Sequence, residues 1–263
     1  MHSLANASPW VFFLLVFFLS IPFYLLGAAG GRLPVVPILP ASALMAFMPM
    51  IAALILVYRT GGAVALLKRA FDFSRIHGVR WYLAALLIMP IVCVGEYGVL
   101  RLTGTPPLDL RIAPGEALSL VPIFLVGAIG EELGWQGYAY PALRGARNAQ
   151  EAAVLLGAVW ALWHVIPFVQ MGRSAGWIFW HCLSTVALRV IIVWLFVNAG
   201  NCVFIAVLFH TMINVAWALF PSHGSHYDPF IAFLILMPVT GLILAFWHPQ
   251  NEPKEGIPHD RSQ

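Results

Sequence analysis

Eight runs of mostly apolar residues constrain the fold of this 263-residue chain more than any other feature. Each is close to the 20 or so residues that an α-helix needs to cross the hydrocarbon core of a bilayer. Only helices and closed barrels satisfy every backbone hydrogen bond in lipid, and the alternating pattern of barrel strands is not seen. The sequence therefore predicts an all-α membrane protein with spans at 9–29, 41–58, 81–100, 117–140, 151–170, 176–198, 201–219 and 230–248.

Composition supports one transmembrane domain over residues 1–263. The chain is 61% hydrophobic and only 10% charged, whereas a soluble domain is about 25% charged. No long linker or internal repeat divides it, and the basic residues are spread over loops, so no nucleic-acid partner is expected. Residues 1–9 carry no Lys or Arg, which predicts a retained first helix rather than a signal peptide.

Lys and Arg residues predict the orientation, because cytoplasmic loops carry more of them. We expect an integral protein of the cell membrane, or of the endoplasmic reticulum in a eukaryote, with both termini cytoplasmic. The cytoplasmic side would hold Arg59, Lys68, Arg69, Arg75, Arg80, Arg144, Arg147, Lys254 and Arg261. The other side would hold Arg32, Arg101, Arg111 and Arg173.

Two further features have structural interpretations. Residues 63–73 are too short and too charged to span, and their apolar spacing predicts a short interfacial helix on the cytoplasmic leaflet. The three cysteines, Cys93, Cys182 and Cys202, lie in apolar runs without metal-type spacing, so we interpret them as small buried hydrophobic residues.

Adjacent glutamates, Glu131 and Glu132, interrupt the span at 117–140. A carboxylate at the centre of a bilayer costs roughly 2.5–3.5 kcal/mol on insertion scales, so the pair should face a polar cavity inside the protein. Neighbouring helical residues point about 100° apart, so the two carboxylates should have different surroundings. Gln136 lies four residues after Glu132, on the same helical face. The structural alternative makes both glutamates ion-pair partners of Arg189, the one cation at that depth.

Two later spans carry histidines. Trp160 and His164 are four residues apart and share a face, and Pro167 should bend or end that helix and open space near the imidazole. His210 and Asn214 share a face of the span at 201–219, where two donors suit an oxyanion. Each pair has a structural alternative: a packed histidine in the first case and a helix–helix hydrogen bond in the second.

Together these residues supply the parts of a peptidase, namely a carboxylate and an imidazole to activate water and donors for a tetrahedral intermediate. No cofactor is needed for this chemistry. HExxH is missing, but Glu131, His164 and His210 from separate helices would suit zinc in a metal-dependent version.

At these residues the chain resembles the CPBP family of intramembrane proteases, which includes CAAX prenyl endopeptidases and bacterial relatives tied to bacteriocin self-immunity. The family motifs EExxxR, FxxxH and HxxxN correspond to Glu131-Glu132 with Gln136, Trp160 with His164, and His210 with Asn214. The resemblance covers 117–217, a core protease-like region. Gln136 replaces the family arginine and loses its permanent charge, while Trp160 keeps an aromatic wall.

The resemblance implies roles for these residues. Glu131 would be the general base on a water, aided by His164, and His210 with Asn214 would stabilise the oxyanion. Glu132 would be an auxiliary carboxylate that is either protonated or paired with Arg189. The expected substrate is a membrane-associated peptide or a lipidated protein, handled next to membrane lipid.

Two other functions fit some of the same residues. Buried Glu and His side chains also build proton relays, so a proton-coupled transporter is one alternative. A non-catalytic membrane scaffold is the other, because Gln136 departs from the family motif.

Three further ionisable residues lie within the spans. For His181 and Arg189, eight residues apart in one span, we favour structural packing. Glu96 should reach the interface near the end of its span.

Overall fold

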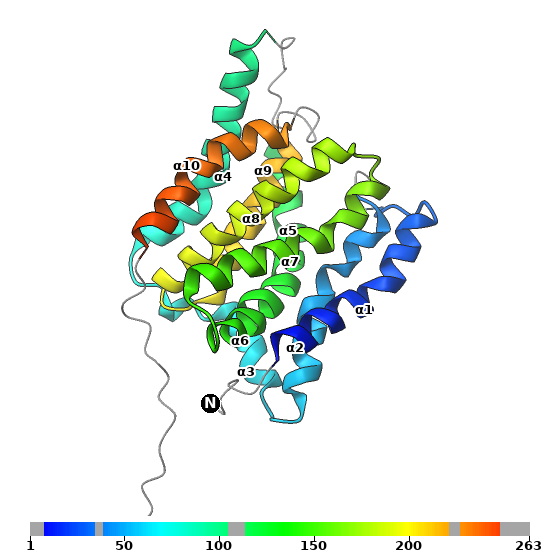
Figure 1. Ribbon diagram of the computed structural model, residues 1–263, viewed down its shortest axis with the longest axis vertical. Coiled ribbons are helices and arrows are strands. Elements are labelled where there is room, and N and C mark those ends of the chain that lie inside the picture. Colours follow the sequence, from blue (N-terminus) through cyan, green and yellow to red (C-terminus); the bar gives the residue numbers. More distant parts are fainter. Residues whose placement is uncertain (1–7, 35–38, 105–113, 221–226, 248–263) are drawn as a thin grey trace, which may run out of the picture.

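The computed structural model describes residues 8–34, 39–104, 114–220 and 227–247 (Figure 1). Over these ranges the regular structure is helical, apart from an isolated bridge between Arg32 and Pro40, which confirms the all-α prediction. The main helices are α1 (Pro9–Ala28), α2 (Met48–Tyr58), α3 (Ala63–Lys68), α4 (Val79–Leu102), α5 (Pro114–Gly134), α6 (Tyr140–Arg144), α7 (Ala149–Gln170), α8 (Ala175–Asn198), α9 (Val203–Leu219) and α10 (Pro229–Phe246). Short helical turns lie at η2 (Ala41–Phe47), η3 (Arg69–Phe71), η4 (Phe73–Arg75) and η5 (Trp135–Ala139). Among the sites discussed above, Arg111, Lys254 and Arg261 lie outside the described residues.

Seven described segments are long and apolar enough to cross a membrane. They are Pro9–Ala28, Ala41–Tyr58, Val79–Leu102, Leu118–Arg144, Ala149–Gln170, Ala175–Asn198 and Pro229–Phe246. The eighth predicted span forms α9, which has 17 residues and is therefore only about 26 Å long. Many of its side chains are completely buried, so α9 is surrounded mainly by protein.

The helices form two layers (Figure 1). One layer runs α10, α8, α7 and α1, and the other runs α4, α9, α5 and α2, with each helix packed against its neighbours in that order. The layers meet through α10 with α4, α8 with α9, and α1 with α2. The two central helices of each layer, α7 and α8 on one side and α5 and α9 on the other, carry the glutamates, both motif histidines and Arg189. The fold therefore gathers these residues between the layers.

The depths of Glu131 and His164 agree once the helix bounds are known. The predicted bounds, 117–140 and 151–170, place His164 nearer the end of its span than the glutamates. The apolar segment that carries Glu131 instead runs on to Arg144, and α7 begins at Ala149. Glu131 is thus about 20 Å from Arg144 along the helix axis, and His164 is about 23 Å from Ala149.

Pro167 does not end its helix, so that part of the prediction is wrong. Helix α7 continues through Pro167 to Gln170, and the backbone N–H of Met171 donates to the Pro167 carbonyl at 2.9 Å. A proline within the last turn of a helix removes one donor, but the helix has few remaining turns to disrupt. The chain then turns at Gly172, whose φ of 73° suits a residue without Cβ.

Three glycines allow close helix approach around the glutamates. A Cβ at Gly134 would lie 2.4 Å from the backbone carbon and oxygen of Pro49, and one at Gly130 would lie 2.8 Å from the Ala46 carbonyl oxygen. On α7, a Cβ at Gly157 would lie 3.0 Å from the Val186 Cα on α8. Small residues at these positions let the backbones pack closely, as in other membrane helix pairs.

The predicted helix at 63–73 is present as α3 followed by the turns η3 and η4. This segment packs on the bundle. Leu66 is buried, and a Cβ added at Gly137 would lie 2.9 Å from its Cδ1. The Arg69 guanidinium donates to the Gly137 carbonyl at 2.6 Å. This contact satisfies a carbonyl in the π-helical turn η5, where the regular helical hydrogen bonding changes.

The glycine packing yields a stability prediction. Gly134→Ala should lower the free energy of unfolding by about 3 kcal/mol, because its methyl group would overlap the Pro49 backbone, which cannot move aside. Gly127→Ala in the same helix is the matched control, since nothing lies within 4 Å of a Cβ there. It should be neutral or stabilising by up to about 1 kcal/mol. Thermal unfolding of both variants in detergent measures the difference, and equal melting temperatures would contradict this account.

Candidate active site

Glu131 lies near the end of α5 with its carboxylate held by two indoles. Its Oε2 accepts hydrogen bonds from Trp160 Nε1 at 2.7 Å and from Trp135 Nε1 at 3.3 Å. Its Oε1 lies 3.9 Å from His210 Nε2, which is too long for a direct hydrogen bond. The residue is only 5% exposed. One oxygen of Glu131 is thus fixed, while the other faces the imidazole across a short gap.

Glu132 is a buried ion-pair partner, as one structural alternative predicted for it. Its Oε2 accepts from Arg189 Nη1 at 2.7 Å, and both side chains are completely buried. Glu131 has no such partner among the described residues, so the alternative holds for one glutamate only. Arg189 is therefore a buried structural residue that pairs with a motif glutamate.

His210 on α9 lies between the two carboxyl groups. Its Nδ1 is 2.8 Å from Glu132 Oε1, and its Nε2 faces Glu131. A carboxylate paired with arginine can only accept, so Nδ1 is the nitrogen that carries a proton towards Glu132. This assignment leaves Nε2 as the ring atom that can act on a substrate or a water.

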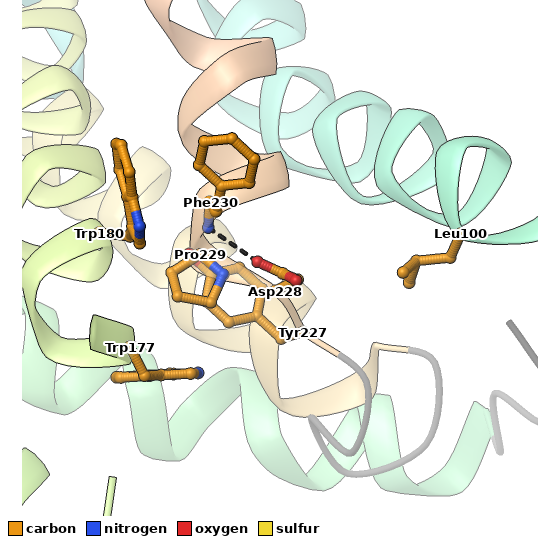
Figure 2. Close-up of a pocket in the computed structure, with 7 residues that line it drawn as sticks. All are labelled: Leu100, Trp177, Trp180, Tyr227, Asp228, Pro229 and Phe230. Carbon is orange, nitrogen blue, oxygen red and sulfur yellow. Dashed lines mark hydrogen bonds between the residues drawn. The ribbon is translucent and has the colours of Figure 1, made fainter. Parts of the chain in front are cut away.

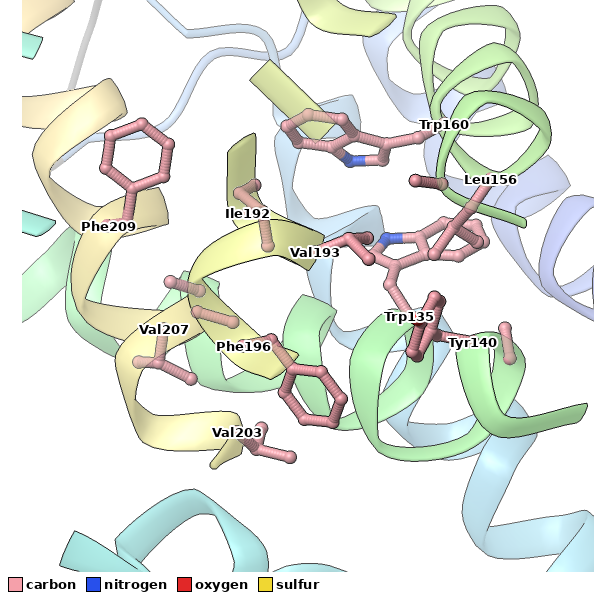
Figure 3. Close-up of a cluster of buried hydrophobic side chains, with 14 of the residues drawn as sticks. Trp135, Tyr140, Leu156, Trp160, Ile192, Val193, Phe196, Val203, Val207 and Phe209 are labelled. Carbon is pink, nitrogen blue, oxygen red and sulfur yellow. The ribbon is translucent and has the colours of Figure 1, made fainter. Parts of the chain in front are cut away.

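Trp160 connects the charged groups from α7. The Arg189 guanidinium carbon lies 3.9 Å from the centre of its ring, a close cation–π contact, while its indole N–H holds Glu131. The predicted aromatic wall is therefore also a hydrogen-bond donor. Figure 3 shows Trp160 and Trp135 beside Leu156 and Val193 in the apolar cluster that surrounds the site.

His164 is held one helical turn from Trp160. Its Nδ1 lies 2.9 Å from the Trp160 carbonyl oxygen, which can only accept, so Nδ1 is the donor and Nε2 is free to act. The imidazole packs edge-on against the Trp160 ring at 5.4 Å and stacks on Phe168 at 5.9 Å. Trp160 thus positions Glu131 through its indole and His164 through its carbonyl.

The side chains of Asn214 and Gln136 make no hydrogen bond to another described residue, unlike those of the other motif residues. Asn214 is half-buried one turn beyond His210, and no hydrogen bond of its side chain is seen among the described residues. Gln136 is completely buried, yet neither amide atom has a partner there. It lies in the π-helical turn η5, which begins at Trp135. Although Gln136 follows Glu132 by four residues, it makes no hydrogen bond with that carboxylate.

The expected polar cavity is closed around the glutamates. Glu132 is 0% exposed and His210 is 2% exposed, and the pocket described below is lined by other residues. Within the described ranges, no three His, Cys, Asp or Glu side chains lie close enough together to hold a metal ion. His164 and His210 both keep Nε2 available, but Glu131, His164 and His210 do not converge as a three-ligand group in the described structure.

Sequence reasoning missed Trp135 as a donor to Glu131, and it named Arg189 as a counter-ion only as an alternative. A cation within an apolar span is itself a signal for Arg189, because a buried charge needs a partner. Glu96 lies near the end of α4, as expected, but it is fully buried there, and one carboxyl oxygen accepts from the Asp228 backbone N–H. The three cysteines are free; Cys93 and Cys202 are buried as expected, and Cys182 is half-buried.

Comparison with known proteins agrees with this geometry. Residues 113–216 match the family described as Type II CAAX prenyl endopeptidase Rce1-like. This region is similar to the CAAX prenyl endopeptidases. The match confirms the resemblance to CPBP proteases that the three motifs predicted. A stretch of 52 residues is 38% identical to the CAAX prenyl protease 2 of Methanococcus maripaludis, and the alignment spans 20% of this chain and 19% of that relative.

The buried ion pair leads to a testable double-mutant cycle. Arg189→Gln should lower the free energy of unfolding by about 3–5 kcal/mol, because it leaves Glu132 charged and unpaired in the interior. Adding Glu132→Gln should recover most of the loss, since two neutral amides replace the pair. Thermal unfolding of the two single variants and the double variant measures the coupling. Strictly additive losses would show that the two side chains do not interact.

Proposed function

We propose that this protein is an intramembrane endopeptidase that hydrolyses a peptide bond of a membrane-associated or lipidated protein. The arrangement of His210 between Glu131 and Glu132 carries the proposal, because it sets a carboxylate and an imidazole nitrogen at the two sides of one short gap. The similarity to CAAX prenyl endopeptidases over residues 113–216 supports the same chemistry.

Glu131 acts as the general base in this proposal. A water molecule against Glu131 Oε1 attacks the carbonyl carbon of the scissile bond while its proton passes to the carboxylate. The carbonyl oxygen then becomes an oxyanion. When the tetrahedral intermediate collapses, the C–N bond breaks and Glu131 returns the proton to the leaving amine. Trp160 and Trp135 bind the opposite oxygen, so the carboxylate keeps one orientation throughout.

His210 and Asn214 stabilise the oxyanion, and His164 assists the water. In this proposal His210 is the doubly protonated imidazolium: Nδ1–H donates to Glu132 and Nε2–H donates to the oxyanion. Asn214 follows one helical turn later. His164 likewise offers Nε2, because the Trp160 carbonyl holds Nδ1. Donors fixed before the reaction avoid the cost of reorganisation at the moment when charge develops.

The pattern of burial suggests where the substrate enters. Glu131, Glu132 and His210 are buried, whereas His164 and Asn214 are half-buried. The substrate would therefore approach on the side of His164 and Asn214. A local opening between α7 and α9 must precede hydrolysis, since the glutamates are covered.

Substrate class and membrane orientation extend the proposal further. The name of the archaeal relative, CAAX prenyl protease 2, favours a lipidated C-terminal segment as the substrate. Both termini would be cytoplasmic in the cell membrane, or in the endoplasmic reticulum of a eukaryote, as the distribution of Lys and Arg predicts. Membrane lipid then surrounds the outer faces of both layers.

The proposed base is tested by Glu131→Gln. Hydrolysis of a quenched peptide library, with and without a prenyl-type lipid, should fall below detection, because the amide cannot accept the proton of the water. Folding should be retained, since the amide oxygen can still accept from Trp160. Glu151→Gln, on the exposed first turn of α7, is the matched control and should keep full activity. Hydrolysis by a folded Glu131→Gln protein would refute the role of Glu131.

The same assay with a strong chelator tests the requirement for metal. We expect full activity, because the donor set does not form a three-ligand site. Loss with the chelator and recovery with zinc would replace the glutamate mechanism by a metal-dependent one. A wild-type protein that cuts nothing would favour the scaffold, and proton-coupled uptake without hydrolysis would favour the transporter.

The indole N–H of Trp160 provides a finer test. Trp160→Phe keeps the aromatic ring but removes the donor at 2.7 Å from Glu131. We expect kcat to fall about tenfold with little change in KM, because a hydrogen bond to a charged group contributes about 1.5 kcal/mol or more. Trp163→Phe is the control, since Trp163 Nε1 donates to Ser20 on α1 instead. Equal kcat values for the two variants would remove Trp160 from the positioning of Glu131.

A further inference from the structure

A second polar region lies at the end of the bundle where α4 ends and where α8 and α10 begin (Figure 1). It contains a pocket of about 450 Å³. Figure 2 shows the lining residues: Leu100, Trp177, Trp180, Tyr227, Asp228, Pro229 and Phe230. Four of these seven residues are aromatic. None of them belongs to the candidate active site.

The charge in the lining is negative. Asp228 Oδ1 caps α10 by accepting from the backbone N–H of Phe230 at 2.9 Å (Figure 2) and from that of Ile231 at 3.4 Å. Its Oδ2 takes no part in the cap. Burial raises the pKa of Tyr227 above its usual range, so that phenol stays neutral. Asp228 is therefore the formal charge among the lining residues.

A second carboxyl group lies directly behind Asp228. Glu96 is completely buried one helical turn before Leu100, and its Oε1 accepts from the Asp228 backbone N–H. Its Oε2 has no partner among the described residues. Glu96 does not line the pocket, so the carboxyl group that a ligand there can contact is that of Asp228.

A guanidinium packs on Trp177, one of the lining residues. The Arg173 guanidinium carbon is 4.7 Å from the Trp177 ring centre, and its Nε is buried without a partner in the described part of the chain. His181 stacks on the same indole at 4.6 Å, with its Nδ1 also unpartnered. The Arg173 guanidinium beside Trp177 can thus donate to an anion, while the Asp228 carboxylate can accept from a cation.

We propose that this pocket binds the head group of a zwitterionic, amine-bearing phospholipid. The ammonium group would contact Asp228 and the faces of Trp180 and Tyr227, because aromatic rings attract organic cations. The phosphate would accept from Arg173. Trp and Tyr at the ends of spanning helices are typical of the level of lipid head groups, where this ligand is most concentrated. The inference is independent of the proposed peptidase activity.

The test compares two lipids that differ only in the head group. Purified full-length protein in detergent is titrated with dioleoyl phosphatidylethanolamine or dioleoyl phosphatidylglycerol, and the bound lipid is counted by native mass spectrometry. The first lipid carries an ammonium group and the second does not. Wild-type protein should bind phosphatidylethanolamine at least tenfold more tightly.

Asp228→Asn removes the charge but keeps the helix cap, because Asn caps as well as Asp does. It should weaken phosphatidylethanolamine binding about tenfold and leave phosphatidylglycerol binding and the melting temperature unchanged. Arg173→Gln should weaken both lipids, since both carry a phosphate. Asp72→Asn, which removes an acidic charge between α3 and α4, should alter neither.

Two results would overturn the inference. Equal binding of both lipids by wild-type protein would show that the aromatic residues only anchor the bundle at the interface. Unchanged phosphatidylethanolamine binding by a folded Asp228→Asn variant would show that the carboxylate does not recognise the ammonium group.

Discussion

The buried pair of Glu132 and Arg189 is the interaction on which the rest of the site depends. It joins α5 of one layer to α8 of the other, with both side chains completely removed from solvent. Neither charge is tolerable alone at that depth, so each requires the other. The pair also fixes its neighbours: Glu132 orients His210 through Nδ1, and Arg189 supports the Trp160 ring, which in turn holds Glu131.

Close helix approach makes this arrangement possible. Gly134 lets α5 lie against the Pro49 backbone, and Gly157 lets α7 lie against α8 beside Arg189. Larger side chains at these positions would separate helices whose polar groups must meet within 3 Å. Backbone packing and polar pairing therefore support one another, and the closed site is the result. The same tight packing explains why hydrolysis would require a local opening between helices.

The counter-ion of Glu132 is Arg189 on α8, not a residue at the position of the motif arginine. Gln136 occupies the position of the motif arginine, yet it has no hydrogen-bond partner in the described structure. Arg189, from the opposite layer, pairs with Glu132 instead. A charge supplied across the interface ties the carboxylate to helix packing, so a change at α8 would reach the site. The loss of the motif arginine does not leave Glu132 without a cation.

The sequence by itself determined the helical class, the positions of the apolar segments and the identity of the motif residues, because the thickness of a bilayer and the 3.6-residue helical repeat act on local sequence. It also showed that His210 and Asn214 share a face. Only the tertiary structure decided that Arg189 pairs with Glu132, that Trp160 donates to Glu131, and that η5 is π-helical. These features depend on which helices become neighbours and how closely they approach, which helical spacing within one segment does not encode.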